Sequence, residues 1–366
     1  MSKTAPQTTS LVDILELLNQ DKVQIVAYLS REFLYLSRSL PRYQWDKQIL
    51  SELQEFIISG KMFRGSLFLQ TYAALTETTE YTPDALLLAT CIETIESGLL
   101  IHDDVMDEDR KRRGKPSIHT GWSTQIAGSF GSANSDHDGK SIAIMMGDLL
   151  YFIAFEWLQN LLVSERIKSD LIVETSRELT LLGLAQVEDY RAALAPEVSQ
   201  AEIMAIHAGK TGHYTGGWPL AMAGILAELP PAQVVELKAF GIELGVLYQL
   251  VDDRLGVFGE SAQTGKYAAT DILKGKKTIY YFLAQQELTG TSRRRFLQQY
   301  GRLDLAESEI QELKDILVTE SVHTEVDVFI EERYQECLKL LKQLSVSSET
   351  RSILRKYTEL THQRVA

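Results

Sequence analysis

The sequence is poor in cysteine: only Cys91 and Cys337 occur in 366 residues, and neither belongs to a CxxC pair. Two isolated cysteines cannot build a disulfide framework or a cysteine-rich zinc site, so we expect a reducing compartment, the cytoplasm. An excess of positive charge is also lacking, since 37 Lys and Arg stand against 50 Asp and Glu, for a formal net charge of -13. This balance argues against a general affinity for nucleic acid or for anionic membrane surfaces.

No uninterrupted apolar run is long enough to cross a bilayer. The most apolar stretch, residues 142–158, includes Asp148 and Glu156 and falls short of the roughly 20 apolar residues that a spanning helix needs. We therefore expect a buried helix there and no transmembrane segment. The first ten residues, MSKTAPQTTS, have no apolar core of the kind a signal peptide requires, so residues 1–10 are expected to form a mobile tail.

Strand-like alternation is scarce, whereas apolar residues recur at three- and four-residue spacing along most of the chain. The pattern is clear in LVDILELLNQDKVQIVAYLSREFLYL, ALLLATCIETIESGLLIHDD and AQVVELKAFGIELGVLYQLVDD. Because no linker interrupts these segments, the sequence predicts an all-α protein with a single large helical domain over residues 11–366. Residues 127–139, rich in Gly and Ser, predict a mobile surface loop.

The segment LLIHDDVMDED places three aspartates at the end of an apolar helix. On a helix, Asp103 and Asp107 lie one turn apart on one face, and Asp104 lies about 100° further round. Like charges at this spacing repel each other unless a cation neutralises them, and Mg²⁺ prefers such oxygen ligands. A solvated acidic helix end is the alternative, but the preceding apolar residues predict a partly buried face, where unpaired carboxylates are costly.

A second acidic pair, Asp252 and Asp253, follows another apolar helix in YQLVDDRLGVFG, with Gln249 one turn earlier. Gly256 stands where a third carboxylate would complete the pattern, so this site offers fewer ligands than the first. Two helices that each present carboxylates are a common way to build a site for several metal ions.

Basic residues occur beside glycines in GKMFRG, RRGK, GKT and TGKYAATDILKGKKT. Each alone is more often a surface residue, yet their grouping in an acidic chain favours anion binding. Carboxylates, metal and cations together imply a bound diphosphate. The cations concerned are Lys61, Arg64, Arg112, Arg113, Lys210, Lys266, Lys274, Lys276 and Lys277, and the Thr211 hydroxyl lies next to Lys210.

Four motifs resemble, in order, those of the trans-type isoprenyl diphosphate synthases, the polyprenyl synthetase family. GKMFRG is similar to the family's GKxxRP segment, and LIHDDVMDEDRKRRGKPSIH to its first aspartate-rich motif. HDGKSIAIMMGDLL is similar to its HxGxxxAILAGDxL segment, and YQLVDDRLGVFG with the following TGK and GKKT to its second aspartate-rich motif. The resemblance runs from about residue 55 to residue 280 and continues more diffusely to the C-terminus.

The resemblance implies a helical bundle around a central active-site cavity, a homodimer, and a magnesium-dependent prenyltransferase that holds up to about three Mg²⁺ ions with diphosphate. The reaction it implies joins isopentenyl diphosphate to an allylic diphosphate, giving a longer all-trans prenyl diphosphate. Its catalytic residues would be Asp103, Asp107, Asp252 and Lys210, and its metal ligands Asp103, Asp104, Asp107, Asp252 and Asp253. Isopentenyl diphosphate would be bound by Lys61, Arg64 and Arg113, and the allylic diphosphate by Arg112, Lys210, Thr211, Gln249, Lys266 and Lys276.

Three residues depart from the family pattern. Glu96 stands where many members have a histidine that contacts isopentenyl diphosphate, and a carboxylate there needs an intervening cation, water or proton. Gly256 replaces the last aspartate of the second motif, as in a subset of geranylgeranyl diphosphate synthases. Gly65 replaces the usual proline, a change expected to affect only the turn.

The product is expected to be geranylgeranyl diphosphate. In the family, a bulky aromatic four or five residues before the first aspartate stops chain growth early, and these positions are Leu99 and Gly98 here, with Ile95 and Cys91 deeper. Farnesyl or longer polyprenyl products remain open. Two other classes also remain: a class I terpene cyclase, which would not need a second diphosphate pocket, and a non-catalytic regulatory subunit of a prenyl synthase.

Overall fold

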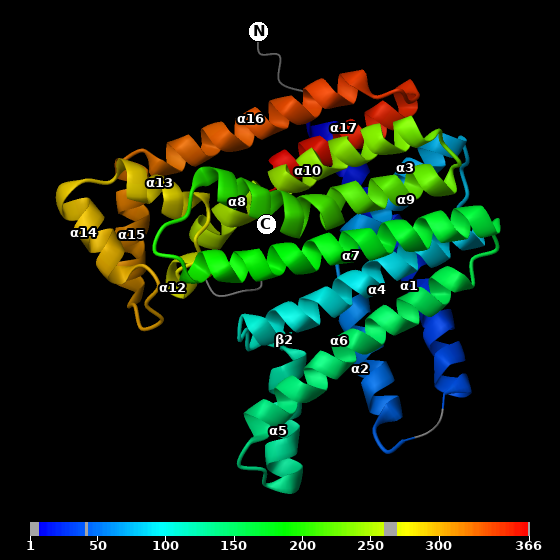
Figure 1. Cartoon of the computed structure of the whole chain (residues 1–366), viewed down its shortest axis with the longest axis horizontal. Helices are drawn as coiled ribbons and strands as arrows, with labels where there is room; N and C mark the ends of the chain where they lie inside the picture. Colours follow the sequence, from blue (N-terminus) through cyan, green and yellow to red (C-terminus); the bar gives the residue numbers. More distant parts are fainter. Residues whose placement is uncertain (1–6, 41–42, 260–268, 365–366) are drawn as a thin grey trace. The chain divides into compact units, whose positions relative to one another are not determined.

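The computed structural model describes residues 7–40, 43–259 and 269–364, and it is built almost wholly of helices (Figure 1). Within these ranges the strands are β1 (Lys111–Arg112) and β2 (Lys115–Pro116), which pair as an antiparallel hairpin. The prediction of an all-α fold is confirmed. Helix α1 begins at Gln7, so it includes the last residues of the expected tail, and residues 1–6 lie outside the described part.

The chain divides into two compact units. Unit 1 consists of Met1–Ile172 and Ile225–Glu228, and unit 2 of Val173–Gly224 and Leu229–Ala366. The single domain expected over residues 11–366 therefore stays a prediction. Each cysteine is free and buried, Cys91 in unit 1 and Cys337 in unit 2, as expected for a chain without a disulfide framework.

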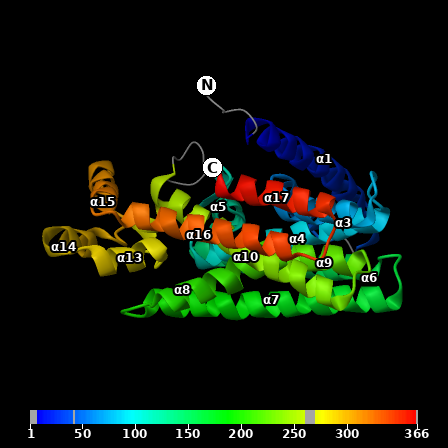
Figure 2. The same ribbon diagram turned by 90° about the horizontal axis from the view of Figure 1, so that it is seen from above.

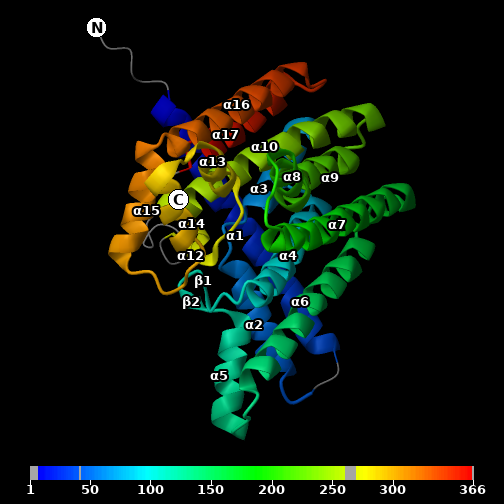
Figure 3. The same ribbon diagram turned by 60° about the vertical axis from the view of Figure 1, so that its left-hand side comes forward.

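Helix α4 is the central helix of unit 1, and it packs against α1, α3 and α6. Thr82 starts it, since its hydroxyl accepts a hydrogen bond from the Ala85 N–H at 3.1 Å and Pro83 occupies the first turn. Helices α5 and α6 lie side by side (Figure 3). The helices of unit 1 are α1 (Gln7–Ser39), α2 (Asp46–Ile58), α3 (Phe63–Thr76), α4 (Pro83–Met106), α5 (Ile118–Phe130), α6 (Ser135–Gln159) and the start of α7 (Glu165–Leu194).

The surface loop predicted at residues 127–139 is wrong over most of its length. Helix α5 continues to Phe130, and α6 already begins at Ser135. Gly131 ends α5 in the left-handed conformation, with φ of 62°, and its N–H bonds back to the Ala127 carbonyl. A glycine in this conformation ends a helix within one residue, so the Gly- and Ser-rich stretch needs little loop.

Two helices of unit 1, α4 and α6, are long and apolar enough to cross a membrane by length and composition. The most apolar window of α4 is 72% buried within the protein and that of α6 44% buried, so α4 is a core helix and α6 leaves an apolar face exposed. The absence of a transmembrane segment remains a prediction.

Unit 2 is organised around α10, which packs against η1, α16 and α17; the last two lie side by side (Figure 2). The segment η1 is a π-helix, a wide helix often found at functional sites. A Cβ on Gly245 of α10 would lie 2.6 Å from the Gly212 Cα of η1, so only glycine allows this approach. The helices of unit 2 after α7 are α8 (Gln200–His207), η1 (Ala208–Gly217), α9 (Trp218–Leu226, which ends in unit 1), α10 (Pro231–Phe258), α12 (Thr270–Lys274), α13 (Ile279–Glu287), α14 (Gly290–Gln299), α15 (Glu307–Thr319), α16 (Val322–Gln343) and α17 (Ser348–His362).

Candidate active site

The first aspartate cluster, Asp103, Asp104 and Asp107, lies at the C-terminal end of α4. Asp107 caps the helix, and its N–H donates to the Asp103 carbonyl at 2.8 Å, which places the two residues one turn apart as expected. The C-terminal end of a helix carries partial negative charge, so three carboxylates there are unfavourable without cations nearby. The fold supplies one such cation from the hairpin.

Arg112 is that cation. The hairpin turns at Arg113 and Gly114, both with positive φ, as a two-residue turn of the mirror-image type requires. Arg112 then donates to Asp104 Oδ1 through Nε at 2.8 Å and through Nη2, and its Nη2 lies 3.7 Å from Asp103. The residue predicted to hold the allylic diphosphate is thus paired with a carboxylate of the first aspartate cluster.

Burial and this pairing act in opposite directions on both partners. Burial lowers the pKa of Arg112, but its hydrogen bond to Asp104 and the surrounding carboxylates outweigh this and raise it above its usual value. Burial raises the pKa of the Asp104 carboxyl, only partly offset by Arg112. The Asp104 carboxylate therefore depends on Arg112 for its charge.

The cations predicted to hold isopentenyl diphosphate gather around the start of α3. Lys61 is exposed just before that helix, and Arg64 is buried in its first turn. Arg113 reaches the same connection, where its Nη1 donates to the Phe56 carbonyl at 3.0 Å and to Ser59 Oγ at 2.9 Å. Burial lowers the pKa of Arg113. The structure therefore brings the three predicted cations to one connection within unit 1.

A carboxyl that the sequence reasoning missed lies beside them. Glu93 of α4 is buried, and its Oε1 accepts a hydrogen bond from the Gly65 N–H at 2.6 Å. Gly65 lies inside the first turn of α3, where a Cβ would come within 2.9 Å of Ile25 and 3.0 Å of Glu93. The expectation that Gly65 affects only the turn is wrong, because proline would lack this N–H. A glutamate inside the apolar run ATCIETIESGLL was the available signal.

The second aspartate cluster, Asp252 and Asp253, lies in the last two turns of α10. Gln249 donates through Nε2 to Asp253 Oδ1 at 2.7 Å, and Thr211 of η1 donates to Gln249 Oε1 at 2.6 Å. Lys210, next to Thr211, donates to Asp189 of α7 at 2.7 Å. Three predicted residues from η1 and α10, Thr211, Gln249 and Asp253, therefore form one hydrogen-bonded chain, and Lys210 pairs separately with Asp189.

Two further residues contact this cluster, and a third lies against Gly256 of the same motif; none of them was assigned to the site from the sequence. His207 Nε2 lies 3.2 Å from Asp253 Oδ2, and Arg364 Nη1 lies 3.3 Å from Asp252 Oδ1. Asp271 of α12 lies against Gly256, since a Cβ on Gly256 would come within 2.6 Å of the Asp271 Cγ. Asp271 thus brings a carboxylate to the side of α10 on which position 256 lacks one.

The remaining predicted lysines differ in position. Lys266 lies outside the described residues. Lys276 follows α12, where its backbone N–H donates to the Asp271 carbonyl at 3.0 Å, so it lies near the second aspartate cluster. Lys277 instead donates to the Ala195 carbonyl. The role of Lys276 at the allylic diphosphate stays a prediction.

The donor chemistry of both clusters suits magnesium. Among the described residues, Asp104 Oδ2 and Asp253 Oδ2 are buried without a hydrogen-bond partner, although the second lies within ion-pair distance of His207. Asp252 is 49% exposed and Asp103 25%, so carboxylate oxygens also reach the surface of each cluster. No three His, Cys, Asp or Glu side chains of the described ranges form a preassembled metal cluster. Magnesium commonly keeps waters and takes phosphate oxygens, so such an incomplete set fits it.

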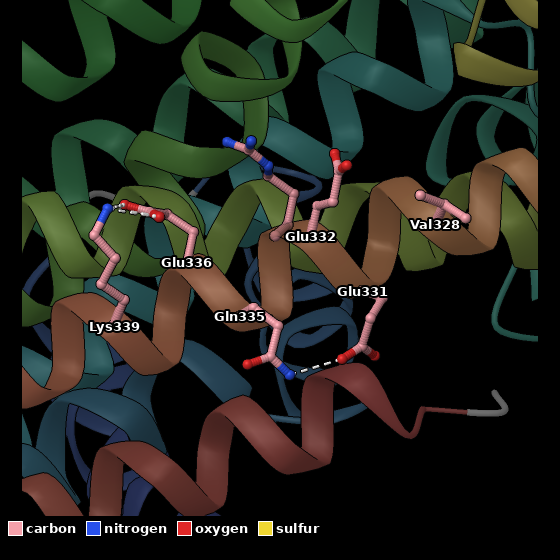
Figure 4. Close-up of a pocket in the computed structure, with 7 residues that line it drawn as sticks. Val328, Glu331, Glu332, Gln335, Glu336 and Lys339 are labelled. Atoms are coloured by element: carbon pink, nitrogen blue, oxygen red, sulfur yellow. Dashed lines mark hydrogen bonds and ion pairs between the residues drawn. The ribbon is translucent and has the colours of Figure 1, made fainter.

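A shallow hollow over α16 is a poor alternative site. Glu331, Glu332 and Glu336 line it, and Glu336 pairs with Lys339 at 3.0 Å (Figure 4). The lining carries more negative than positive charge and comes from one exposed helix face, so it would repel a diphosphate.

Comparison with known proteins identifies the family of the chain and agrees with its fold. The profile of the polyprenyl synthetase family matches residues 46–317, more than half of the chain. The chain therefore belongs to the polyprenyl synthetase family. The geranylgeranyl diphosphate synthase of Mycobacterium tuberculosis is 32% identical over 60% of this chain and 57% of that protein, and that of Saccharolobus solfataricus is 28% identical over 74% and 76%.

The fold is similar to that of a solved geranylgeranyl pyrophosphate synthase. Geranylgeranyl pyrophosphate synthase from Corynebacterium glutamicum, crystallised with isoprenyl diphosphate and magnesium, superposes with a TM-score of 0.85 over 95% of this chain and 99% of that one. At 23% identity, this similarity shows the fold.

Proposed function

We propose that this chain, a prenyltransferase by its family, condenses isopentenyl diphosphate with an allylic diphosphate to give a longer all-trans prenyl diphosphate. The observation that carries the proposal lies in unit 1. There an aspartate cluster suited to magnesium accompanies a separate set of cations, Lys61, Arg64 and Arg113, around the start of α3. A class I terpene cyclase ionises one allylic diphosphate and has no use for this second set.

The chain's residues divide the work by charge. Magnesium, when bound, supplies the Lewis-acid chemistry that neutralises the leaving diphosphate. Its ligands would be Asp103, Asp107 and Asp252, with Asp104 and Asp253 in support, and the ion pair with Arg112 favours the charged form of Asp104. Lys210, Thr211 and Gln249 orient the allylic diphosphate by donating hydrogen bonds, with Lys266 and Lys276 as further cations.

The reaction needs a dry pocket. As the allylic C–O bond breaks, the double bond of isopentenyl diphosphate attacks the allylic carbon, and the departing diphosphate takes the proton lost afterwards. Apolar side chains such as Leu99 and Ile95 exclude water, which would otherwise capture the cation as an alcohol. We propose geranylgeranyl diphosphate as the product, because residue 99 is not aromatic and both relatives named above carry that name.

We also propose a cytoplasmic homodimer. The exposed face of α6 carries Ile144, Met145 and Phe152, with exposed fractions of 45%, 57% and 68%. Contiguous apolar side chains on a surface helix favour burial against another protein surface. Sedimentation equilibrium of the purified chain tests the assembly: a dimer is expected, and a monomer at micromolar concentration would contradict it.

Product analysis tests the reaction. The purified chain is supplied with labelled isopentenyl diphosphate and dimethylallyl, geranyl or farnesyl diphosphate in turn, with Mg²⁺ or with EDTA, and products are separated by chromatography. A C20 diphosphate that forms only with Mg²⁺ is expected. Asp103→Ala should abolish it, whereas Asp170→Asn, at an exposed aspartate that pairs with Arg166, should not. Cyclic products from an allylic substrate alone would instead support a terpene cyclase, and inactivity without a second subunit a regulatory protein.

A further inference from the structure

Arg64 carries an internal carboxylate partner. Its Nη1 forms a short ion pair with Glu96 Oε1, and the two side chains are 6% and 13% exposed. Arg64 comes from α3 and Glu96 from α4, both within unit 1. An anion that approaches Arg64 therefore meets a guanidinium whose charge is already compensated.

Glu93 completes the arrangement. Burial, and then the charge of Glu96, raise the pKa of Glu93 well above its usual value, and the two carboxyls share a hydrogen bond. Burial and the neighbouring carboxylate therefore favour the neutral form of Glu93. Its Oε1 accepts from the Gly65 N–H, which anchors the carboxyl pair to the first turn of α3. Arg113 also interacts electrostatically with both glutamates.

We propose that Glu96 sets a weak affinity for isopentenyl diphosphate by competing with the diphosphate for Arg64. This inference rests on the proposed function, because it assigns the Arg64 side of the site to that substrate. A homoallylic diphosphate carries two to three negative charges, so it must displace or oppose the Glu96 carboxylate to contact the guanidinium. Arg113, whose Nη1 donates to the Phe56 carbonyl and to Ser59 Oγ, and the exposed Lys61 supply further positive charge at the same connection.

The position of Glu96 makes the charge effect separable from packing. Glutamine keeps the volume of the side chain and an oxygen that accepts from Arg64, so Glu96→Gln changes the local charge by one unit and little else. A neutral partner leaves Arg64 with its full charge for the substrate. We expect the dissociation constant of isopentenyl diphosphate to fall by about five- to tenfold, the size of effect of one nearby charge on an anion in a partly buried site.

Isothermal titration with isopentenyl diphosphate alone measures this directly, because no condensation occurs without the allylic substrate. The matched control is Glu165→Gln, which makes the same charge change at an exposed residue paired with Lys168 at 3.2 Å. Glu165 lies at the start of α7, far from the first aspartate cluster. The nearby Leu162 N–H donates to Asp84, which is at the N-terminal end of α4, whereas Asp103 is at its C-terminal end. The dissociation constant of isopentenyl diphosphate from Glu165→Gln should match that from the parent chain.

Steady-state kinetics separates this role from orientation of Arg64. If Glu96 competes with substrate, Glu96→Gln lowers KM for isopentenyl diphosphate and leaves kcat within about twofold. A raised KM or dissociation constant would overturn the proposal, because it would mean that the carboxylate positions Arg64 for binding. Should Glu96→Gln fail to fold, Glu96→His makes the same measurement with a neutral ring at pH 8. If Glu96→Gln binds isopentenyl diphosphate more tightly but the parent chain has no condensation activity, the proposed function is wrong and the role of Glu96 in binding is still supported.

Discussion

The Asp271 carboxylate lies against the Cα of Gly256, in the space that a side chain at position 256 would occupy. A Cβ on Gly256 would come within 2.6 Å of the Asp271 Cγ and 3.0 Å of Oδ1. The missing third aspartate of the second motif and the buried aspartate fifteen positions later are therefore two parts of one arrangement. A carboxylate is present at this place in space although position 256 itself has none.

Gly256→Ala should destabilise the chain by about 1–3 kcal/mol, because the added methyl group overlaps a buried carboxylate that packing holds in place. The free energy of unfolding, from urea titration followed by circular dichroism, measures the effect. Gly183→Ala is the matched control, since nothing lies within 4 Å of its added Cβ in helix α7. That change should stabilise the chain by about 0.5–1 kcal/mol. Equal effects of the two substitutions would show that Asp271 does not hold this position.

Arg112→Ala should cost about 3–5 kcal/mol of stability, because it leaves the buried Asp104 carboxylate without its cation. Loss of Arg112 raises the pKa of Asp104 further above its usual value, so the variant binds this proton more tightly when folded than when unfolded. Its stability must therefore fall as pH rises above about 4. The melting temperature in EDTA should accordingly drop more at pH 8 than at pH 5. The stability of Arg112→Lys, which keeps the charge but not the planar guanidinium, should lie between that of the parent chain and that of Arg112→Ala. A loss of stability that does not depend on pH would contradict this account.

Glu93→Gln should flatten part of the pH dependence of stability. Burial raises the pKa of Glu93 above the unfolded value of 4.5. Ionisation of Glu93 therefore does not lower the stability of the native state below that pH, and stability is lost as pH rises toward the folded pKa. Each pH unit inside that window is worth about 1.4 kcal/mol at most. Glutamine can accept from the Gly65 N–H without this cost. The variant should gain stability over the parent between pH 5 and pH 8, and parallel stability curves would show that Glu93 does not hold its proton.

Leu99→Phe should shorten the product toward farnesyl diphosphate while the chain stays folded, because an aromatic ring would then stand four residues before Asp103. The neighbouring position behaves differently. A Cβ on Gly98 would lie 2.8 Å from the Tyr151 ring and 2.9 Å from the Gly147 carbonyl of α6. Gly98→Ala should therefore lower the melting temperature. Chromatography of dephosphorylated products measures the product length of Leu99→Phe, and a melting curve measures the stability of Gly98→Ala. An unchanged C20 product from Leu99→Phe would contradict the assignment of residue 99.

Sequence periodicity and charge predicted the all-α fold, and the spacing of Asp103 and Asp107 predicted their shared helix face. These features are local, so three- and four-residue spacing encodes them. The contacts of Glu93 with Gly65 and of Asp271 with Gly256 were missed, because each joins residues from different helices. Arg112 was predicted as a diphosphate ligand from its place in the first aspartate-rich motif, and its hydrogen bond to Asp104, set by a two-residue hairpin turn, was missed.

The glycine contact between η1 and α10 makes the number of residues in η1 important for the structure of unit 2. Gly212 lies directly against Gly245, so the two backbones pack together with no side chain between them. A π-helix holds more residues per turn than an α-helix, so deleting one residue from 212–217 would rotate every following side chain relative to Lys210 and Thr211. The chain can exchange side chains there more readily than it can change length, and a frame-preserving deletion of three bases in this stretch of its gene would be more damaging than most single substitutions.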